Sequence, residues 1–496
     1  MRVENATPRP AAKLARAGNE DDMGSARDDR RGALRIGVLI TELLVEGGGE
    51  RQAVYLAREL QDMGHDVVLY TTAHDPQRCY PEVCAQLRVV VTGGHPLARL
   101  PVPSRRLRDY LNMRHLARHL RGPFDVLNPH HWPPHWAAVG AARRSFPPPA
   151  VVWMCNDPPW HPPSLSDGSP SGFRRLTSPL RRLTSRAQRW HDLRTTADVS
   201  KIVVLSGIAK RQVDATYGAD CKVVRSGVDL ASLRTDDPAE PADIRREHAI
   251  SSEAFLLLAL GILMPHRRLE DALAGVATAV AEGHDIHFLI VGSPLQHPDY
   301  ADHLRTLTND LGLGQRVTFT GAVPDNRLPL YYRACDAFIF PNENQTWGLA
   351  VTEAMAYGKP AIVSTGATVQ EILEDGKTAF LVPPRRPDAI ATVLCRLIDS
   401  PELRMAVAER GRQHVLNTLS WRRYAQAMLG IFEESIALLR GGIPGMSQGQ
   451  TPVAGVPREA SSRREAESYV SRIGGSRGAL SVASTQEGAD EDAGTR

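Results

Sequence analysis

The sequence predicts an α/β protein made of two doubly wound domains that face each other across a cleft. Short apolar runs alternate with amphipathic stretches along most of the chain, which is typical of parallel strands joined by helices. A polar joint at 235–247 separates a first series of such units from a second. Ligands of doubly wound sheets bind at the carboxyl ends of the strands, so a site is expected where the two edges meet.

Composition narrows the class of protein. The 496 residues are 42% hydrophobic and 23% charged, as in ordinary soluble globular proteins, and are enough for two or three domains. The net charge of +3 is too small to predict nucleic acid as a partner. The six cysteines form no C-x-x-C pair, which favours buried thiols in a reducing compartment. No signal-peptide core and no run of about 18 apolar residues is found, so a cytoplasmic location is expected.

The apolar runs give the expected elements in order. The first series begins with a strand at 34–40, a loop holding Gly47, Gly48 and Gly49, and a helix at 50–65. Further strands of this series are expected at 66–72, 124–130, 150–155 and 201–206. The second series predicts strands at 254–261, 286–292, 316–321, 336–341 and 360–364, and a closing amphipathic helix at 420–439.

These elements set the expected domain boundaries. The N-terminal domain is placed at 33–235, the C-terminal domain at 250–418 and the closing helix at 419–440. The ends, 1–32 and 441–496, are rich in small and charged residues and poor in aromatic ones, and are expected to be disordered tails.

The stretch NENQTWGLAVTEAMAYGKP at 342–360 leaves a buried strand at a carboxyl edge and enters a short helix. Gly348 allows the backbone to approach a ligand, and Gly358 and Pro360 end the helix. The first N–H groups of that helix make an anion site. Glu353, one turn beyond Leu349, is placed to accept hydrogen bonds from neutral hydroxyls such as those of a ribose. The alternative is a carboxylate solvated on an exposed face.

Motifs in this stretch and elsewhere resemble glycosyltransferase family 4, whose members have the GT-B fold and transfer sugars from nucleotide donors with retention of configuration. The resemblance lies in Gln345–Thr346–Trp347–Gly348–Leu349, Glu353–Ala354–Met355–Ala356, Gly358 and Pro360. Motifs in the family's order also occur at 47–67, 203–230, 258–273, 289–293, 317–341, 364–384 and 420–424. Together they cover about residues 34–440.

The resemblance implies two Rossmann-like domains, the first binding the acceptor and the second binding the donor, a nucleotide sugar. Glu353 would bind the ribose, and the backbone at Gly348 and Leu349 would meet the pyrophosphate. The donor-binding residues implied are Gly48, Gly49, Arg267, Arg268, Glu343, Gln345, Thr346, Trp347, Gly348, Leu349 and Glu353. Of these, Gln345, Glu353 and Arg267 are the expected catalytic residues.

Three positions depart from the family pattern. Gln345 stands where a glutamate is usual, with Glu343 two residues earlier; a neutral amide can still bind sugar hydroxyls. The usual phosphate-binding Arg-then-Lys pair falls on Ile262 and Arg267. A histidine common on the acceptor side aligns with Asn156.

Stabilisation of the leaving diphosphate is the main catalytic requirement of a retaining transfer. Arg267 and Arg268 can supply it, because guanidinium groups match phosphate with forked donors. The part of the sequence that carries the motifs, 34–440, has no Asp-x-Asp stretch that would argue for a metal ion, so neither a metal nor another cofactor is expected.

The segment HHWPPHW at 130–136 follows another expected strand. It allows three interpretations: a metal site, rings that line the acceptor pocket, or tryptophans in the core. The expected acceptor-side residues are His130, His131, Trp132, Asn156 and Asp157.

The stretch 173–194 carries seven arginines against one aspartate, with apolar residues between them. It reads as a solvated helix or as a contact with anionic lipid or an acidic acceptor, which would place the protein peripherally at the inner face of a membrane. A monomer or weak oligomer is expected.

The function expected from these features is a retaining glycosyltransferase that moves a hexose, such as mannose or glucose, from a nucleotide diphosphate sugar to a hydroxyl of a saccharide, lipid-linked or small-molecule acceptor. The alternatives are a nucleotide-sugar epimerase of the same fold and a non-catalytic nucleotide-sugar-binding scaffold. A dehydrogenase is disfavoured because the G-x-G-x-x-G fingerprint is missing and the strand at 66–72 has no acidic residue at its end.

Overall fold

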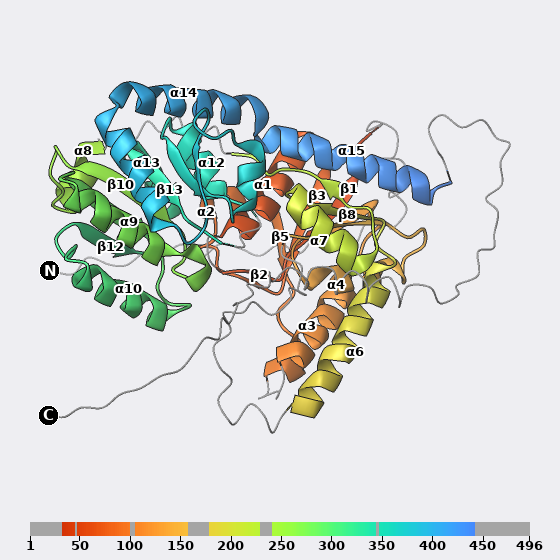
Figure 1. Cartoon of the computed structure of the whole chain (residues 1–496). Helices are drawn as coiled ribbons and strands as arrows, with labels where there is room; N and C mark the ends of the chain where they lie inside the picture. The colour runs from red at the N-terminus through yellow and green to blue at the C-terminus, as the bar shows by residue number, and fades with distance from the viewer. Residues whose placement is uncertain are drawn as a thin grey trace, which may run out of the picture. The chain divides into compact units, whose positions relative to one another are not determined.

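The computed structural model describes residues 32–44, 47–99, 105–156, 178–228, 241–343 and 347–441 (Figure 1). The tails expected at 1–32 and 441–496 lie outside the described residues, except for Gly32 and Gly441.

A seven-stranded parallel sheet organises the first half of the chain, in the order β5-β3-β1-β6-β7-β8-β9. Its strands are β1 (Arg35–Leu39), β3 (Asp66–Thr71), β5 (Arg88–Val91), β6 (Val126–Pro129), β7 (Ala150–Met154), β8 (Lys201–Val204) and β9 (Lys222–Val223). Two short strands, β2 (Glu42–Leu43) and β4 (Ala73–His74), pair beside it. The helices of this half are α1 (Gly48–Asp62), α2 (Pro81–Cys84), α3 (Arg105–His119), α4 (Pro134–Ala142), α6 (Ser178–Thr196) and α7 (Gly207–Tyr217), with the 3-10 turn η1 (Pro96–Arg99).

A six-stranded parallel sheet organises the second half, in the order β12-β11-β10-β13-β14-β15. Its strands are β10 (Phe255–Leu260), β11 (Ile286–Val291), β12 (Val317–Gly321), β13 (Ala337–Phe340), β14 (Ala361–Ser364) and β15 (Phe380–Val382). The helices are α8 (Pro241–Glu247), α9 (Leu269–Ala281), α10 (Pro298–Asp310), α11 (Leu328–Ala334), α12 (Leu349–Ala356), α13 (Pro387–Asp399), α14 (Pro401–Thr418) and α15 (Trp421–Leu439), with 3-10 turns η3 (Pro265–Arg267), η4 (Asp325–Arg327) and η5 (Thr368–Ile372). Every residue of β11 is buried, as expected of a parallel sheet covered on both faces.

The last helix, α15, returns to the first sheet and packs against α1 and β7. Trp421 at its start contacts Tyr55 of α1, with ring centroids 5.2 Å apart. At its end, Arg440 donates a 2.9 Å hydrogen bond to Asp125. The chain therefore crosses twice between the halves that the two sheets define.

The predicted doubly wound α/β class is confirmed, and each strand range expected from the sequence contains a strand. Sequence analysis missed the short strands β2, β4, β5, β9 and β15, because runs of two to four residues carry little periodicity. Among the described helices, none combines the length and apolar character that a bilayer span requires.

Candidate functional site

The site is built around the start of α12, which follows the carboxyl end of β13. Gly348 precedes the helix, and no side chain caps its first N–H groups. A methyl group added at Gly348 would lie 3.0 Å from Val369 Cγ1, so the backbone there is closely packed. Trp347 is 4% exposed, and its indole N–H has no hydrogen-bond partner among the described residues.

Glu353 lies on α12 and is not the solvated surface carboxylate that the sequence left open. Its side chain is 13% exposed. Oε2 accepts a 2.8 Å hydrogen bond from the hydroxyl of Tyr332 on α11. Oε1 pairs with the guanidinium of Arg51. Both carboxylate oxygens are therefore held, one by each half of the chain.

Arg51 comes from the first turn of α1, two residues after Gly49. Its guanidinium also pairs with Asp325 of η4 and lies 5.4 Å from the ring centre of Tyr80. Burial opposes its charge, but Glu353, Tyr80 and Asp325 together hold the pKa of Arg51 well above its usual value. One cation thus binds two carboxylates across the two halves.

The glycine loop before α1 meets the start of α12. A methyl group added at Gly48 would lie 3.3 Å from Leu349 Cδ1, and one at Gly49 only 1.7 Å from His131 Nε2. His131 has a left-handed backbone, with φ 61°, and follows the carboxyl end of β6. The structure therefore brings together four residues that the sequence assigned to the donor and acceptor sides.

Arg267, in η3 after β10, is the second cation of the site. Its Nε has no partner, and it forms no ion pair with a carboxylate in the described part of the chain. Burial lowers the pKa of Arg267 to about 10. Its guanidinium lies 5.8 Å from the ring centre of Phe340 and beside Gly261, in a small cavity at the carboxyl ends of β10, β11 and β13. A desolvated cation without a counter-ion is suited to an anionic ligand.

Arg268 has a different environment. It donates hydrogen bonds of 3.0 and 2.8 Å to the two carboxylate oxygens of Asp271 and pairs with Glu270 at 2.6 Å. Its backbone is left-handed, with φ 51°. Both carboxylate partners of Arg268 lie on α9. Of the two arginines expected to bind phosphate, only Arg267 has no carboxylate partner in the described part of the chain.

The loop between β13 and α12 is described in part. Glu343 accepts hydrogen bonds from Nε and Nη2 of Arg385, at 3.1 and 3.0 Å. Gln345 and Thr346 lie outside the described residues.

The segment His130–Trp136 lies mostly in the core. His130 is wholly buried and contacts Asn128 Oδ1 at 2.9 Å, and burial lowers its pKa to about 3. The indole N–H groups of Trp132 and Trp136 both donate to Asp192 of α6, at 2.9 and 2.8 Å. This arrangement favours the core interpretation for the two tryptophans.

Asp192 explains why those rings turn inward. The carboxylate is wholly buried, accepts a 2.7 Å hydrogen bond from the hydroxyl of Tyr217, and lies 3.1 Å from His135 Nε2. Burial lowers the pKa of His135. The shared carboxylate accepts hydrogen bonds from three donors, the indole N–H groups of Trp132 and Trp136 and the hydroxyl of Tyr217, and so joins α6 to α4 and α7.

Asn156 is buried behind α1 and donates a 2.7 Å hydrogen bond to Gln52 Oε1. Its own Oδ1 has no partner in the described part of the chain. Asp157, the other expected acceptor-side residue there, lies outside the described residues.

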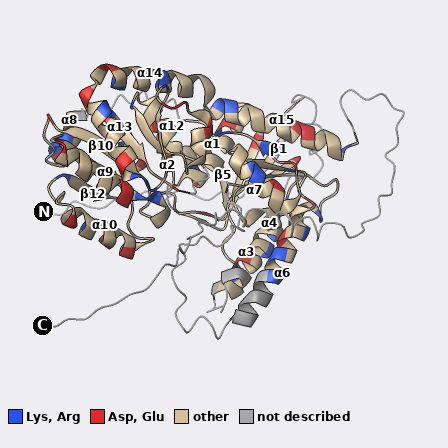
Figure 2. Cartoon of the chain, in the orientation of Figure 1, with Lys and Arg blue, Asp and Glu red and all other residues tan. Residues whose placement is uncertain are grey.

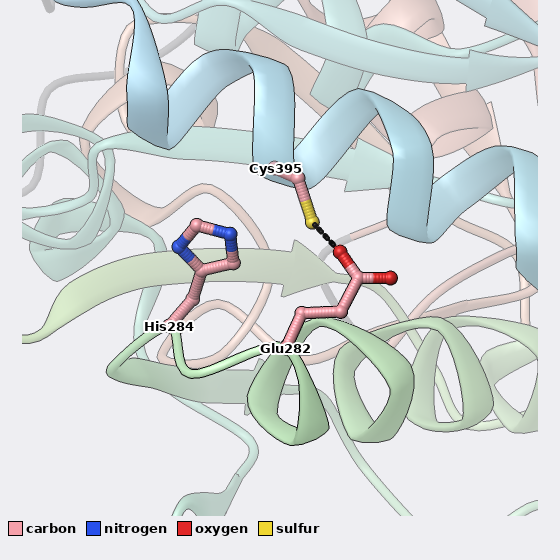
Figure 3. A group of neighbouring side chains, drawn as sticks. All are labelled: Glu282, His284 and Cys395. Carbon is pink, nitrogen blue, oxygen red and sulfur yellow. Dashed lines mark hydrogen bonds between the residues drawn. The ribbon is translucent and has the colours of Figure 1, made fainter.

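One group of side chains in the described residues has metal-ligand chemistry: Glu282, His284 and Cys395, whose ligand atoms lie within 4.8 Å of one another (Figure 3). The Cys395 thiol donates to Glu282 at 3.2 Å, and burial and this carboxylate raise its pKa to about 11. Glu282 follows the carboxy-terminal end of α9, before β11 begins. The group therefore lies at the opposite sheet edge from Arg267 and Glu353.

The family models match both halves of the chain. Residues 46–232 match the model described as Glycosyltransferase Family 4, and residues 241–414 match Glycosyl transferases group 1. The chain belongs to glycosyltransferase family 4 and is a glycosyltransferase. Its two sheets form the GT-B architecture, as expected from the sequence.

Individual relatives are distant. The chain is 27% identical to a D-inositol 3-phosphate glycosyltransferase of Acidothermus cellulolyticus, over 79% of this chain and 86% of the relative. It is 24% identical to an alpha-D-kanosaminyltransferase of Streptomyces kanamyceticus, over 54% of this chain and 68% of the relative. Among solved structures, HepE of Anabaena in complex with UDP and glucose superposes with a TM-score of 0.62 at 18% identity, over 81% of this chain and all of that chain.

Sequence reasoning missed Arg51, Asp325 and Tyr332. Arg51 directly follows the GGGE motif, so its place near the loop could be inferred. Asp325, which pairs with Arg51, and Tyr332, which donates to Glu353, could not be inferred, because both lie far along the chain in the other half.

Proposed function

We propose that this glycosyltransferase moves a hexose from a nucleoside diphosphate sugar to a hydroxyl of a saccharide, lipid-linked or small-molecule acceptor, with retention at the anomeric carbon. The observation that carries the proposal is that Arg267, a half-buried arginine with no counter-ion among the described residues, and the carboxylate Glu353 both lie at the carboxyl edge of one sheet. These two groups are complementary to two adjoining parts of such a donor, the diphosphate and the ribose.

Arg267 binds the diphosphate. Its forked donors match phosphate oxygens, and its burial strengthens the attraction to an anion. The uncapped start of α12 after Gly348 adds N–H groups of the right polarity. Arg268 contributes less, because Asp271 and Glu270 already neutralise it.

Glu353 binds the ribose hydroxyls. Oε1 is now paired with Arg51, so a ribose has to share or displace that guanidinium, which keeps Asp325 as a partner. Tyr332 holds Oε2 and orients the carboxylate. Donor binding is thus coupled to the contact between the two halves.

In the proposed step, the bond between the anomeric carbon and the diphosphate oxygen breaks, and the acceptor oxygen bonds to that carbon on the same face. The leaving phosphate oxygen takes the acceptor proton, so no separate base is needed. The residues stabilise the charge that develops on the diphosphate. Gln345 is proposed to hydrogen-bond the sugar, and no metal is required.

The printed names of the relatives are consistent with this proposal: they include transferases to D-inositol 3-phosphate and a neighbour bound to UDP and glucose. These names support a nucleotide-linked donor. The ion pair between Arg51 and Glu353 is an observation on this chain.

The test is a thermal-shift screen of the purified chain against a panel of nucleoside diphosphate sugars, followed by slow donor hydrolysis without acceptor. We expect one donor to raise the melting temperature and to release free sugar in the same anomeric form. Glu353→Ala should remove both signals while keeping the far-ultraviolet circular dichroism spectrum. The proposal fails if no donor binds, or if the sugar is converted to its epimer without transfer.

The metal requirement is measured separately. Transfer should persist in excess chelator, and added Mg²⁺ or Mn²⁺ should change the rate by less than about twofold. A chelator that abolishes turnover would contradict the proposed metal-free stabilisation by Arg267.

A further inference from the structure

Blue segments, which mark lysine and arginine, recur along α3 and α6 of the N-terminal half (Figure 2). We call the surface formed by α3, α4 and α6 the basic face. Its described and exposed arginines are Arg108, Arg114, Arg118, Arg143, Arg144, Arg186, Arg189 and Arg194. The whole chain has a net charge of only +3, so these charges are gathered on one face rather than spread evenly.

Few carboxylates compensate this charge among the described residues. Arg143 pairs with Asp198 across half-exposed side chains. Asp192, although on α6, is wholly buried and faces the core. Among the described residues no other ion pair is identified for an arginine of the basic face, and Asp109 of α3 makes an interaction of its own.

A cavity of about 380 Å³ opens within the basic face, between α3, α4 and α6. Four arginines line it, namely Arg114, Arg118, Arg143 and Arg144, together with the apolar and aromatic surfaces of Met113, Tyr110 and Trp136. The rings of Tyr110 and His191 lie 5.3 Å apart and join α3 to α6. The cavity therefore combines an apolar wall with a ring of guanidinium groups.

Large apolar side chains are exposed among these arginines. Trp190 is 62% exposed and Leu193 37% exposed on α6, and Leu107 is 46% exposed on α3. The guanidinium of Arg194 lies 5.4 Å from the ring centre of Trp190. Tryptophan beside arginine is suited to the boundary between lipid headgroups and acyl chains.

We propose that the basic face docks onto an anionic membrane surface, with a lipid phosphate in the cavity between α3, α4 and α6. The arginines supply donors for the phosphate and attraction to the negative leaflet. Trp190, Leu193 and Leu107 supply the apolar contact, which a hydrated nucleic acid backbone would not reward. The proposal concerns the surface alone and does not depend on the identity of the sugar donor.

The test is co-sedimentation of the full chain with vesicles of phosphatidylcholine alone or with 30% phosphatidylglycerol. We expect binding to the anionic vesicles only, reduced about tenfold by 0.5 M NaCl because salt screens exposed charges. The double variant Arg114→Glu/Arg118→Glu should bind anionic vesicles about tenfold less well than the unmodified chain.

The control variant Arg305→Glu/Arg412→Glu changes the charge equally on exposed helices of the other half and should bind vesicles normally. Circular dichroism and donor hydrolysis should be unchanged in both variants, which separates loss of docking from misfolding. A third variant, Trp190→Ser, should weaken binding while leaving the charge intact.

Equal binding to neutral and anionic vesicles would overturn the proposal, as would equal losses in the test and control variants. So would binding of inorganic phosphate or a short RNA by the basic face without any binding of vesicles. Binding of phosphate alone would assign the cavity to a soluble anion, and binding of RNA alone would assign it to a nucleic acid.

Discussion

Arg51 on α1 and Glu353 on α12 form an ion pair that joins the two halves of the chain. Each side chain is 13% exposed, so the pair is largely withdrawn from water. Asp325 is bound to the same guanidinium. The carboxylate assigned to the donor is thus occupied by the protein itself before any donor arrives.

The energy of this pair can be measured with a double-mutant cycle of Arg51→Met and Glu353→Gln. We expect a coupling free energy of about 2 kcal/mol in thermal denaturation, because the pair is mostly buried. The half-exposed pair Arg143–Asp198 is the matched control and should give less than about 0.5 kcal/mol. Similar couplings for both pairs would show that Arg51 and Glu353 are solvated in solution.

Arg51→Met should also bind nucleoside diphosphate about three- to tenfold more tightly than the unmodified chain. The reason is that the ribose no longer competes with the guanidinium for Glu353, and removing a competing state raises apparent affinity. Isothermal titration calorimetry measures the change. Weaker binding would instead mean that Arg51 contacts the ligand directly.

Substitutions of Arg267 and Arg268, the two neighbouring arginines after β10, should differ in their effects on nucleoside diphosphate affinity. Arg267→Met should weaken nucleoside diphosphate binding at least about tenfold and the free nucleoside by less than about twofold. Arg268→Met should change either affinity less than about threefold, since Asp271 and Glu270 hold that charge. Equal losses in the two variants would refute the distinction.

Without ligand, Arg267→Met should raise the melting temperature by about 2–4 °C. Burial without a counter-ion lowers the pKa of Arg267 to about 10, which means that its charged form is disfavoured in the folded state. Replacing it removes that cost, about 1 kcal/mol after allowance for partial exposure. A lower melting temperature would indicate that the side chain stabilises the loop.

Acid stability should depend on His130. Burial lowers its folded pKa to about 3, below the unfolded value of about 6.5. The unfolded state therefore binds more protons between these values, and stability falls as pH drops below about 6.5, by up to about 1.4 kcal/mol per pH unit.

His130→Asn should flatten this part of the profile of denaturation midpoint against pH, measured from pH 7 to 4. The same substitution at the exposed His303 is the control and should leave the profile unchanged. Identical slopes in the unmodified chain and the His130 variant would show that other groups control acid unfolding.

Glu371 of η5 gives a second contact between the halves. Its carboxylate accepts hydrogen bonds of 2.7 Å from the N–H groups of Gly207 and Ile208, at the start of α7. Glu371→Gln should cost about 1–2 kcal/mol of stability, because charge-assisted bonds at a helix start are lost. Glu374→Gln, at an exposed pair with Lys377, should cost less than about 0.5 kcal/mol. Equal effects would assign no special role to the contact.

The sequence predicted the parts of the molecule whose signals are local. Buried apolar runs mark β1, β10, β11 and β13, because a parallel strand covered on both faces must be apolar throughout. The glycine before α12 and the carboxylate one turn later could be read as a ligand loop from their spacing. The family resemblance added the order of the motifs and the GT-B class.

Only the tertiary structure decided the partners of the charged groups. Arg267 and Arg268 are adjacent in sequence and identical in chemistry, yet Arg267 is half-buried without a counter-ion among the described residues and Arg268 binds Asp271 and Glu270. Asp192, 56 residues beyond Trp136, accepts hydrogen bonds from the indole N–H groups of both Trp132 and Trp136, which places those polar groups in the core. The physical reason is that the interaction energy of a charged or polar group depends on the groups nearest to it in space. Folding brings such partners together from distant positions in the sequence, as it brings Glu353 to Arg51, 302 residues away.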